Sequence, residues 1–220
     1  MASGEWRPGD AIPSEADLAL RFGVSQGTVR KAVDEMATEN LLVRRQGKGT
    51  FVATHDDPHS FFRFLRLAAN EGKLPPSRSV PLECGRARAG ADVAQVLGLE
   101  QGAAIVIVRR LLYFGDAPVV FDEIYLPGDL FQDLSLEILK ESDKSLYSLF
   151  ETRYGVRMIR ADERLFAVAA EGIAARQLKV AEGSPLLLVE RVTFTYSGKP
   201  VEWRRGFYLT QKHHYHNVLI

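Results

Sequence analysis

The chain has 220 residues, 46% of them hydrophobic, and its 28 basic residues equal its 28 acidic residues in number. This composition predicts a soluble protein with a buried core, divided into one large domain or two small ones. A single cysteine excludes an internal disulfide and a cysteine-rich metal site, and the apolar runs are too short for a membrane span or a signal peptide, so we expect a cytoplasmic protein.

Two short helices are predicted within the first forty residues. Ser14 is placed as the N-cap of the first helix, Gly23 as its end, and Ser25 as the N-cap of the second. The tight connection between them is typical of a helix-turn-helix. The side chains expected to be buried repeat at helical spacing: Leu18, Ala19 and Phe22 in the first helix, and Val29, Ala32, Val33 and Met36 in the second.

A hairpin is predicted after these helices. Two strand-like runs, 41–43 and 50–52, flank the segment Arg44-Arg45-Gln46-Gly47-Lys48-Gly49, which carries three cations and two glycines. A basic hairpin beside a helix-turn-helix indicates the wing of a winged helix. Residues 1–53 are therefore expected to form a winged helix-turn-helix domain.

Basic side chains gather on the second helix and the wing, since ranges 25–33 and 41–53 contain no acid and the acids Glu15 and Asp34 are expected to lie elsewhere. These surfaces are expected to follow DNA phosphates, while the first turn of the second helix reaches base edges. Glycine in a helix costs about 1 kcal/mol relative to alanine, so Gly27 indicates a close approach of backbone to DNA. The predicted DNA-binding residues are Ser14, Ser25, Gln26, Gly27, Thr28, Arg30, Lys31, Arg45, Gln46, Gly47 and Lys48.

The sequence changes in character after the polar segment 54–60, which is a candidate linker. Beyond it, extended apolar segments alternate with helical candidates, which predicts an α+β domain over 61–220 with a mostly antiparallel sheet. The predicted strands are 105–113, 119–126, 186–196 and 201–209, and the predicted helices are 61–71, 92–98, 145–153 and 170–178.

The second region contains a faint internal repeat. The pattern Ala94-x-x-Leu97-x-Leu99-x-x-Gly102 recurs 81 residues later as Ala175-x-x-Leu178-x-Val180-x-x-Gly183. Each copy continues into a strand with an arginine at the same position, Arg110 and Arg191, and then into a hairpin. We interpret the region as two similar halves related by a pseudo-twofold axis, with a ligand cleft expected where the halves meet.

The motifs of the first region resemble the GntR family of bacterial transcription regulators. The residues that carry the resemblance are Pro8-Gly9-Asp10, Pro13-Ser14-Glu15, Phe22-Gly23-Val24-Ser25, Thr28-Val29-Arg30 and Gln46-Gly47-x-Gly49-Thr50-Phe51-Val52. The remainder is similar to the effector-binding UTRA domain of the HutC subfamily, whose fold resembles that of chorismate lyase. The resemblance implies a repressor that binds a double-stranded operator and responds to a small polar or anionic metabolite. A single recognition helix per chain predicts a homodimer on an inverted repeat.

Three departures from the family pattern affect these expectations. Gln26 replaces the usual arginine at the start of the recognition helix, which favours contact with adenine over guanine. Leu112 replaces a second arginine of the effector site, which favours a less anionic ligand. Because seven residues precede Pro8, the family's first helix is expected to be missing, and apolar surface on the other two helices is expected to be exposed.

The resemblance, carried over position by position, predicts six effector-binding residues: Arg110, Asp122, Ser145, Tyr147, Glu202 and Tyr208. Three of them are also notable without it, because charged side chains within apolar strands persist only when they are paired or liganded. Two structural alternatives remain: Arg110 forms an internal salt bridge with Asp122 or Glu202, or these side chains face solvent on the outer side of the sheet.

Other function classes have weaker support in the sequence. We find no nucleophile elbow, no metal constellation and no glycine-rich nucleotide loop, and therefore expect no catalytic residue, metal or cofactor. His213-His214-Tyr215-His216 is either a polar C-terminal segment or a metal cluster in which His214 and His216 share a side. The alternative to a DNA-binding regulator is a ligand-binding or lyase-like module that no longer binds DNA.

Overall fold

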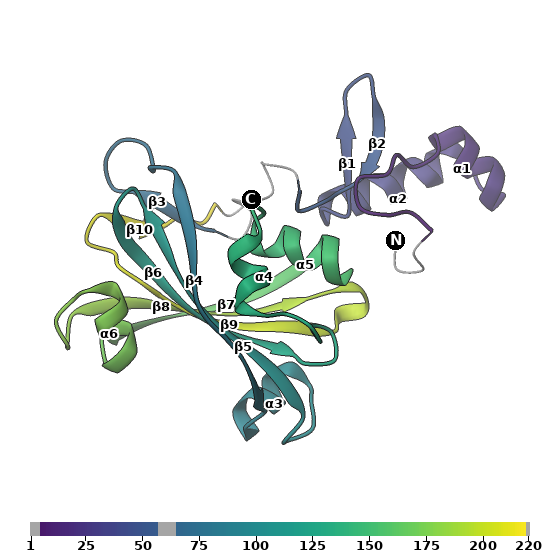
Figure 1. Cartoon of the computed structure of the whole chain (residues 1–220). Helices are drawn as coiled ribbons and strands as arrows, with labels where there is room; N and C mark the ends of the chain where they lie inside the picture. Colours follow the sequence, from purple (N-terminus) through teal and green to yellow (C-terminus); the bar gives the residue numbers. More distant parts are fainter. Residues whose placement is uncertain (1–4, 57–64, 219–220) are drawn as a thin grey trace. The chain divides into compact units, whose positions relative to one another are not determined.

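A computed structural model of the chain describes residues 5–56 and 65–218 (Figure 1). The chain forms two compact units, Met1–Ser60 and Phe61–Ile220, which we call the N-terminal unit and the C-terminal unit. Residues 57–60 of the predicted linker 54–60 lie outside the described residues.

The N-terminal unit contains the predicted helix-turn-helix and wing. Helix α1 spans Glu15–Phe22, helix α2 spans Gln26–Thr38, and strands β1 (Leu42–Arg45) and β2 (Gly49–Val52) form an antiparallel hairpin. Ser14 Oγ accepts from the Asp17 N–H at 3.2 Å, and Ser25 Oγ accepts from the Thr28 N–H at 3.1 Å. Gly23 ends α1 at φ +66°, a conformation that side chains disfavour. The predicted caps are confirmed.

Two of the side chains predicted for the core of this unit are exposed instead. The core consists of Leu18, Val29, Val33, Leu42 and Val52. Phe22 is 59% exposed because it ends α1 and lies against the Arg21 guanidinium, whose Cζ is 5.3 Å from the ring centroid. Ala32 is exposed because the buried stripe of α2 is narrow. With Leu20 and Val24 also exposed, the expected apolar surface is present on α1 and the turn after it. Residues 5–14 contain no helix.

The C-terminal unit is built on a six-stranded antiparallel sheet with the strand order β4-β5-β6-β9-β8-β7. The strands are β4 (Ser77–Arg88), β5 (Ala104–Phe114), β6 (Ala117–Pro127), β7 (Arg160–Ala169), β8 (Pro185–Phe194) and β9 (Pro200–Tyr208). A separate two-stranded sheet pairs β3 (Leu67–Ala69) with β10 (His213–Tyr215). The helices are α3 (Ala91–Leu97), α4 (Leu136–Glu141), α5 (Leu146–Tyr154) and α6 (Gly172–Leu178), with a 3₁₀ turn at Tyr196–Gly198. The predicted α+β class is confirmed.

The internal repeat corresponds to two halves with the same order of elements. One half is β4-α3-β5-β6 and the other is β7-α6-β8-β9, and they meet where β6 pairs with β9. The pairing places Glu123 opposite Arg205, with the stacked ring pairs Phe121–Phe207 and Tyr125–Trp203 on either side. The prediction that one set of elements is built twice is therefore confirmed.

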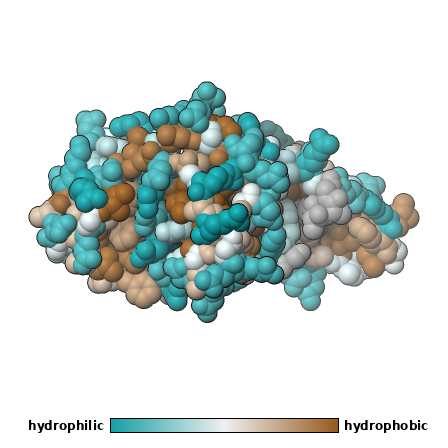
Figure 2. Space-filling model, turned by 60° about the horizontal axis from the view of Figure 1, so that its bottom comes forward, coloured by the Kyte–Doolittle hydropathy of each residue, from teal (hydrophilic) through white to brown (hydrophobic). Residues whose placement is uncertain are grey.

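Helices cover the two faces of this sheet differently. Helices α4 and α5 pack on the face that carries Val106, Val108, Ile124 and Leu126. Helices α3 and α6 pack on the opposite face, against Ile105 and Trp203 and against Leu111 and Phe121, since alternate strand residues point to opposite faces. Figure 1 shows α3 and α6 well apart from each other, with α4 and α5 together. On the side of the molecular surface that Figure 2 shows, apolar patches are separated by hydrophilic side chains.

One predicted helix is wrong. Within the range 61–71, residues 67–69 form β3, because their backbone pairs with β10 and Leu67 packs against Leu112 and Val120 in the core; residues 61–64 lie outside the described part. Strands β4 and β7 and helix α4 were not predicted from the sequence. Pro81 and several charged residues obscure β4, and β7 is exposed over residues 164–167, so neither shows a clear apolar alternation.

Candidate DNA-binding and effector sites

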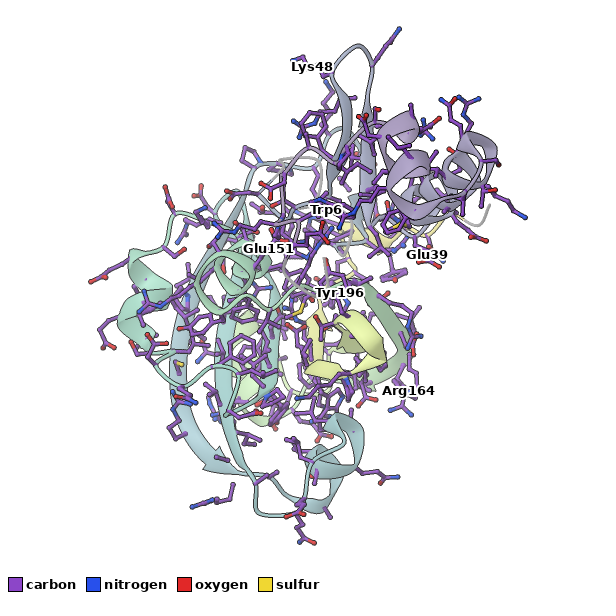
Figure 3. All side chains as sticks on the ribbon, turned by 90° about the vertical axis from the view of Figure 1, so that its right-hand side faces the viewer. Trp6, Glu39, Lys48, Glu151, Arg164 and Tyr196 are labelled. Carbon is purple, nitrogen blue, oxygen red and sulfur yellow. The ribbon has the colours of Figure 1, made fainter. Side chains whose placement is uncertain are left out.

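The predicted DNA-binding residues lie on the surface of the N-terminal unit. All eleven of them are exposed. Ser25 and Thr28 share a hydrogen bond of 2.9 Å between their hydroxyls, so both side chains are fixed at the start of α2. On the wing, the Arg45 guanidinium lies over the Phe51 ring, and Lys48 lies at the tip (Figure 3). This surface combines a helix N-terminus with basic side chains, the two features that hold phosphates.

Gly27 has no structural need to be glycine. A Cβ atom added there would meet only Ser25 Oγ, at 3.8 Å, which is an ordinary van der Waals contact. Its φ is not among the positive values of the described chain, so its backbone would accept any residue. The missing side chain therefore leaves open space outside the helix, as a close approach to DNA requires.

We expect Gly27→Ala to stabilise the N-terminal unit and to weaken operator binding. Alanine adds up to about 1 kcal/mol of helix stability, while its methyl group occupies the space of the close approach. Thermal unfolding and fluorescence anisotropy with labelled operator measure the two effects. A variant that gains both stability and operator affinity would contradict the assigned role of Gly27.

Acids lie closer to the basic face than the sequence indicated. Arg30 Nε is 2.9 Å from Glu15 Oε2, and Arg44 Nη2 is 3.1 Å from Glu15 Oε1. Arg44 also pairs with Asp34 at 2.7 Å. The expectation that these acids lie elsewhere is wrong, because the first turn of α1 packs beside α2 and β1 although it is distant in sequence. The hydrogen bond from Arg30 is the main cause that lowers the pKa of Glu15. Glu15 thus holds both guanidinium groups in place.

Four charged side chains of the C-terminal unit meet on the sheet face that α4 and α5 cover. Arg110 on β5, Asp122 on β6, and Glu202 and Arg204 on β9 are each at most 9% exposed. Arg110 Nε donates to Asp122 Oδ2 at 2.9 Å. Arg204 donates to both oxygens of Glu202 at 3.0 Å and approaches Asp122 Oδ2 at 3.4 Å. The internal salt bridge considered for Arg110 therefore exists, and the solvent-facing alternative does not.

The aromatic and hydroxyl side chains predicted for the site are placed unequally around this charged cluster. Tyr147 donates to Glu202 Oε1 at 2.9 Å, and its ring centroid lies 5.2 Å from the Arg204 Cζ. Burial raises the pKa values of Tyr147 and Tyr208 to about 12, so both stay protonated donors. Ser145 instead caps α5 by accepting from the Ser148 N–H at 3.2 Å, and so orients the helix that carries Tyr147.

Tyr208 and Asp122 occupy the space above Gly206. A Cβ atom added to Gly206 would come within 2.6 Å of Tyr208 Cε2 and 2.9 Å of Asp122 Oδ1. Real Cβ atoms do not approach other atoms so closely, so this position requires glycine.

Asp122 Oδ1 is buried and has no hydrogen-bond partner within the described chain. The pKa of the Arg110 guanidinium is lowered. Burial is the largest cause, and the nearby positive charge of Arg204 is the second. The cluster therefore retains one buried acceptor without a donor.

Sequence reasoning missed four residues. One is Arg204 of the charged cluster, and the others are Arg191, Glu163 and Tyr215, which together with the charged cluster we call the wider cluster. Arg204 follows Glu202 by two residues on one strand, so the alternation of the strand could have found it. Arg191 is 3% exposed and occupies the position of Arg110 in the second half, so the repeat pointed to it. Its Nε lies 2.5 Å from Glu163 Oε1, and Tyr215 donates to the other oxygen of Glu163. No sequence signal linked Glu163 with Tyr215.

The described residues have few groups suited to other chemistry. They include no group of three or more histidines, cysteines, aspartates or glutamates that could hold a metal ion. The rings of His214 and His216 lie 5.9 Å apart on one side of the chain, and His214 Nδ1 is 3.0 Å from Asn70 Oδ1. Burial raises the pKa of Cys84 to about 11, so its thiol is a poor nucleophile. No helix of the described chain is long and apolar enough to span a bilayer.

Comparisons with known proteins agree with the geometry of both units. The family model of bacterial regulatory proteins of the gntR family matches residues 1–52, and the UTRA domain model matches residues 77–214. The HTH-type transcriptional regulator Rv0792c of Mycobacterium tuberculosis is 32% identical over 198 residues, which are 88% of this chain and 72% of that protein. The mannosyl-D-glycerate transport/metabolism system repressor MngR of Escherichia coli is 27% identical over 216 residues, 96% of this chain and 87% of that protein.

A solved structure is also similar to the C-terminal part of this chain. It is the ligand-binding domain of a GntR-family transcriptional regulator from Bordetella bronchiseptica, with 48% identity and a TM-score of 0.70 over 72% of this chain and 98% of that one. The regulators of this family are not enzymes. The chain belongs to the gntR family of bacterial regulatory proteins, in the branch with a UTRA domain, and is a DNA-binding transcription regulator.

Proposed function

We propose that the chain is a cytoplasmic repressor that binds an inverted-repeat operator as a homodimer and is controlled by a small polar metabolite at the charged cluster. The observation that carries the proposal is the buried group of Arg110, Asp122, Glu202 and Arg204 at the join of the two halves. Burying four charges is expensive unless they are paired, and one acceptor of this group, Asp122 Oδ1, has no partner among the described residues. A ligand donor would satisfy that acceptor.

The charges of the wider cluster restrict the chemistry of the metabolite. Three guanidinium groups, those of Arg110, Arg191 and Arg204, are paired with the three carboxylates of Asp122, Glu163 and Glu202. Leu112, at the place of the family's second arginine, is buried in an apolar cluster. This balance favours a ligand that offers hydroxyl or ammonium donors together with at most one anionic group. Sugar acids and amino-acid derivatives have this chemistry, and the similar regulator MngR is named for mannosyl-D-glycerate.

The cluster has a structural connection to the start of the C-terminal unit. Glu163 joins Arg191 to Tyr215, and Tyr215 lies on β10, which pairs with β3. Strand β3 begins at Leu67, the seventh residue of the C-terminal unit. A metabolite that rearranges the guanidinium groups therefore changes how β10 and β3 are held. This is the route by which binding reaches the DNA-binding unit.

We expect Arg30→Ala and Gln26→Ala to weaken DNA binding in different ways. Arg30 contacts phosphate, so its loss lowers affinity for operator and random DNA alike and reduces the salt dependence. Gln26 contacts a base edge, so its loss removes about 1–3 kcal/mol of discrimination between operator and random DNA. Anisotropy titrations at several salt concentrations separate the two. Equal losses of affinity on both DNAs for both variants would show that the roles are misassigned.

A gel-shift assay on the DNA upstream of the chain's own gene tests the proposed function. Binding to this DNA at concentrations that leave random DNA free supports the repressor. A chain that binds metabolites but no DNA would support the ligand-binding or lyase-like module instead.

A further inference from the structure

Strand β7 is an exposed edge of the six-stranded sheet. It is 10 residues long and pairs with β8 from Arg160 to Ala169 without a register shift. Leu165 is 47% and Phe166 42% exposed. Because successive residues of a strand point to opposite faces, β7 exposes a large apolar side chain on both faces of the sheet. Figure 3 shows Arg164, the residue before them, at the outside of this unit.

The other edge of the sheet, β4, is protected in ways that β7 is not. Strand β4 contains Pro81, and its register shifts between Pro81 and Glu83. A proline and a bulge are devices that keep an edge strand from pairing with another chain. Strand β7 has neither, and among the described residues the backbone hydrogen bonds of 161–168 are those of its ladder with β8. Within the part of the chain that the structure describes, its outer row of backbone groups has no partner strand.

We propose that β7 pairs antiparallel with β7 of a second copy, about a twofold axis at Leu165, so that the two sheets become one. This inference rests on the proposed homodimer and names its interface. The addition of a strand contacts both Leu165 and Phe166, whereas a partner docked on one face of the sheet would leave the other side chain exposed. An identical strand is present in every second copy, and such an interface closes at two chains.

The sequence of β7 favours this register over those with an earlier axis. With the axis at Leu165, the two leucines face each other, and Arg164 of each copy lies opposite Phe166 of the other, an arrangement that favours a cation–π contact. An axis one residue earlier would place Arg164 against Arg164, and an axis two residues earlier would place Glu163 against Glu163. Like charges directly opposite each other destabilise a ladder.

Molar mass by light scattering tests the interface in the full chain. The wild type at micromolar concentration is expected to have twice the 24.5 kDa mass of one chain. Leu165→Lys and Phe166→Lys each place two like charges near the axis and are expected to give the mass of a single chain. Leu20→Lys, at a side chain 86% exposed in the N-terminal unit, is the matched control and is expected to remain a dimer.

Cysteine cross-linking tests the register independently of the lysine variants. In a Cys84→Ser background, Leu165→Cys is expected to form a disulfide-linked dimer on oxidation, because directly opposite residues of an antiparallel ladder lie within disulfide reach. Arg160→Cys, at the end of the strand, is expected to remain unlinked. A monomeric wild type would overturn both the homodimer and this interface. A dimer that survives both lysine variants and does not cross-link at position 165 would overturn the interface alone.

Discussion

Glu202→Ala is expected to destabilise the C-terminal unit by about 3–5 kcal/mol, the loss that follows when one partner of a buried ion pair is removed. Glu202 is 0% exposed, and it accepts both hydrogen bonds from Arg204 and one from Tyr147. Alanine leaves the buried Arg204 guanidinium with the more distant Asp122 as its acidic partner. A loss of this size is a large fraction of the stability of a typical domain.

Urea unfolding followed by tryptophan fluorescence measures this loss in the full chain. Trp203 lies in the sheet and is 6% exposed, so a Trp6→Phe background restricts the signal to the C-terminal unit. Glu182→Ala, at an exposed position of the same unit, is the control and is expected to change stability by less than about 0.5 kcal/mol. If Glu202→Ala behaves like this control, the cluster does not hold the two halves together.

Arg110→Ala is expected to abolish the response to the metabolite while leaving metabolite-free operator binding nearly intact. Coupling between two sites of this kind typically changes affinity five- to hundredfold, and the ligand must bind the two conformations differently to produce it. Arg110 is the predicted ligand contact that is paired directly with Asp122, whose other oxygen lacks a partner in the described chain. In the proposed site, its removal takes away the contact through which the ligand acts.

Arg109→Ala is the matched control for this experiment. Arg109 is the preceding residue of β5, faces the other side of the sheet, and pairs with Glu83 and Glu123. It is expected to retain the full response. The compound to use is one that raises the thermal unfolding temperature of the wild type in a screen of sugar acids, sugar phosphates and amino-acid catabolites. If Arg110→Ala still releases operator at an unshifted compound concentration, Arg110 is structural and the effector site lies elsewhere.

Local features of the sequence predicted most of the secondary structure. Ser14, Gly23 and Ser25 mark helix ends by contacts within four residues, so they could be recognised without knowledge of the fold. The internal repeat likewise predicted the two halves of the sheet. The helix predicted for 61–71 failed because β3 exists only through its pairing with β10, more than 140 residues away. Tertiary pairing decided a segment whose own sequence was ambiguous.

The partners of charged side chains were the least predictable part of the sites. Arg110 and Asp122 face each other on adjacent strands of one hairpin, so their pairing follows from the predicted strands. The pairs of Arg191 with Glu163 and of Arg30 with Glu15 depend on the register of β7 with β8 and on the packing of α1 against α2. Neither register nor packing can be derived from the spacing of residues in the chain.

A titration of labelled upstream DNA with the full chain, with and without the compound found by the thermal screen, tests the central claim most directly. The chain is expected to prefer this DNA to random DNA, and the compound is expected to change the operator affinity five- to hundredfold. By linkage, saturating operator must change the affinity for the compound by the same factor. An operator affinity that the compound leaves unchanged, although the compound binds the chain, would contradict control of DNA binding by the charged cluster.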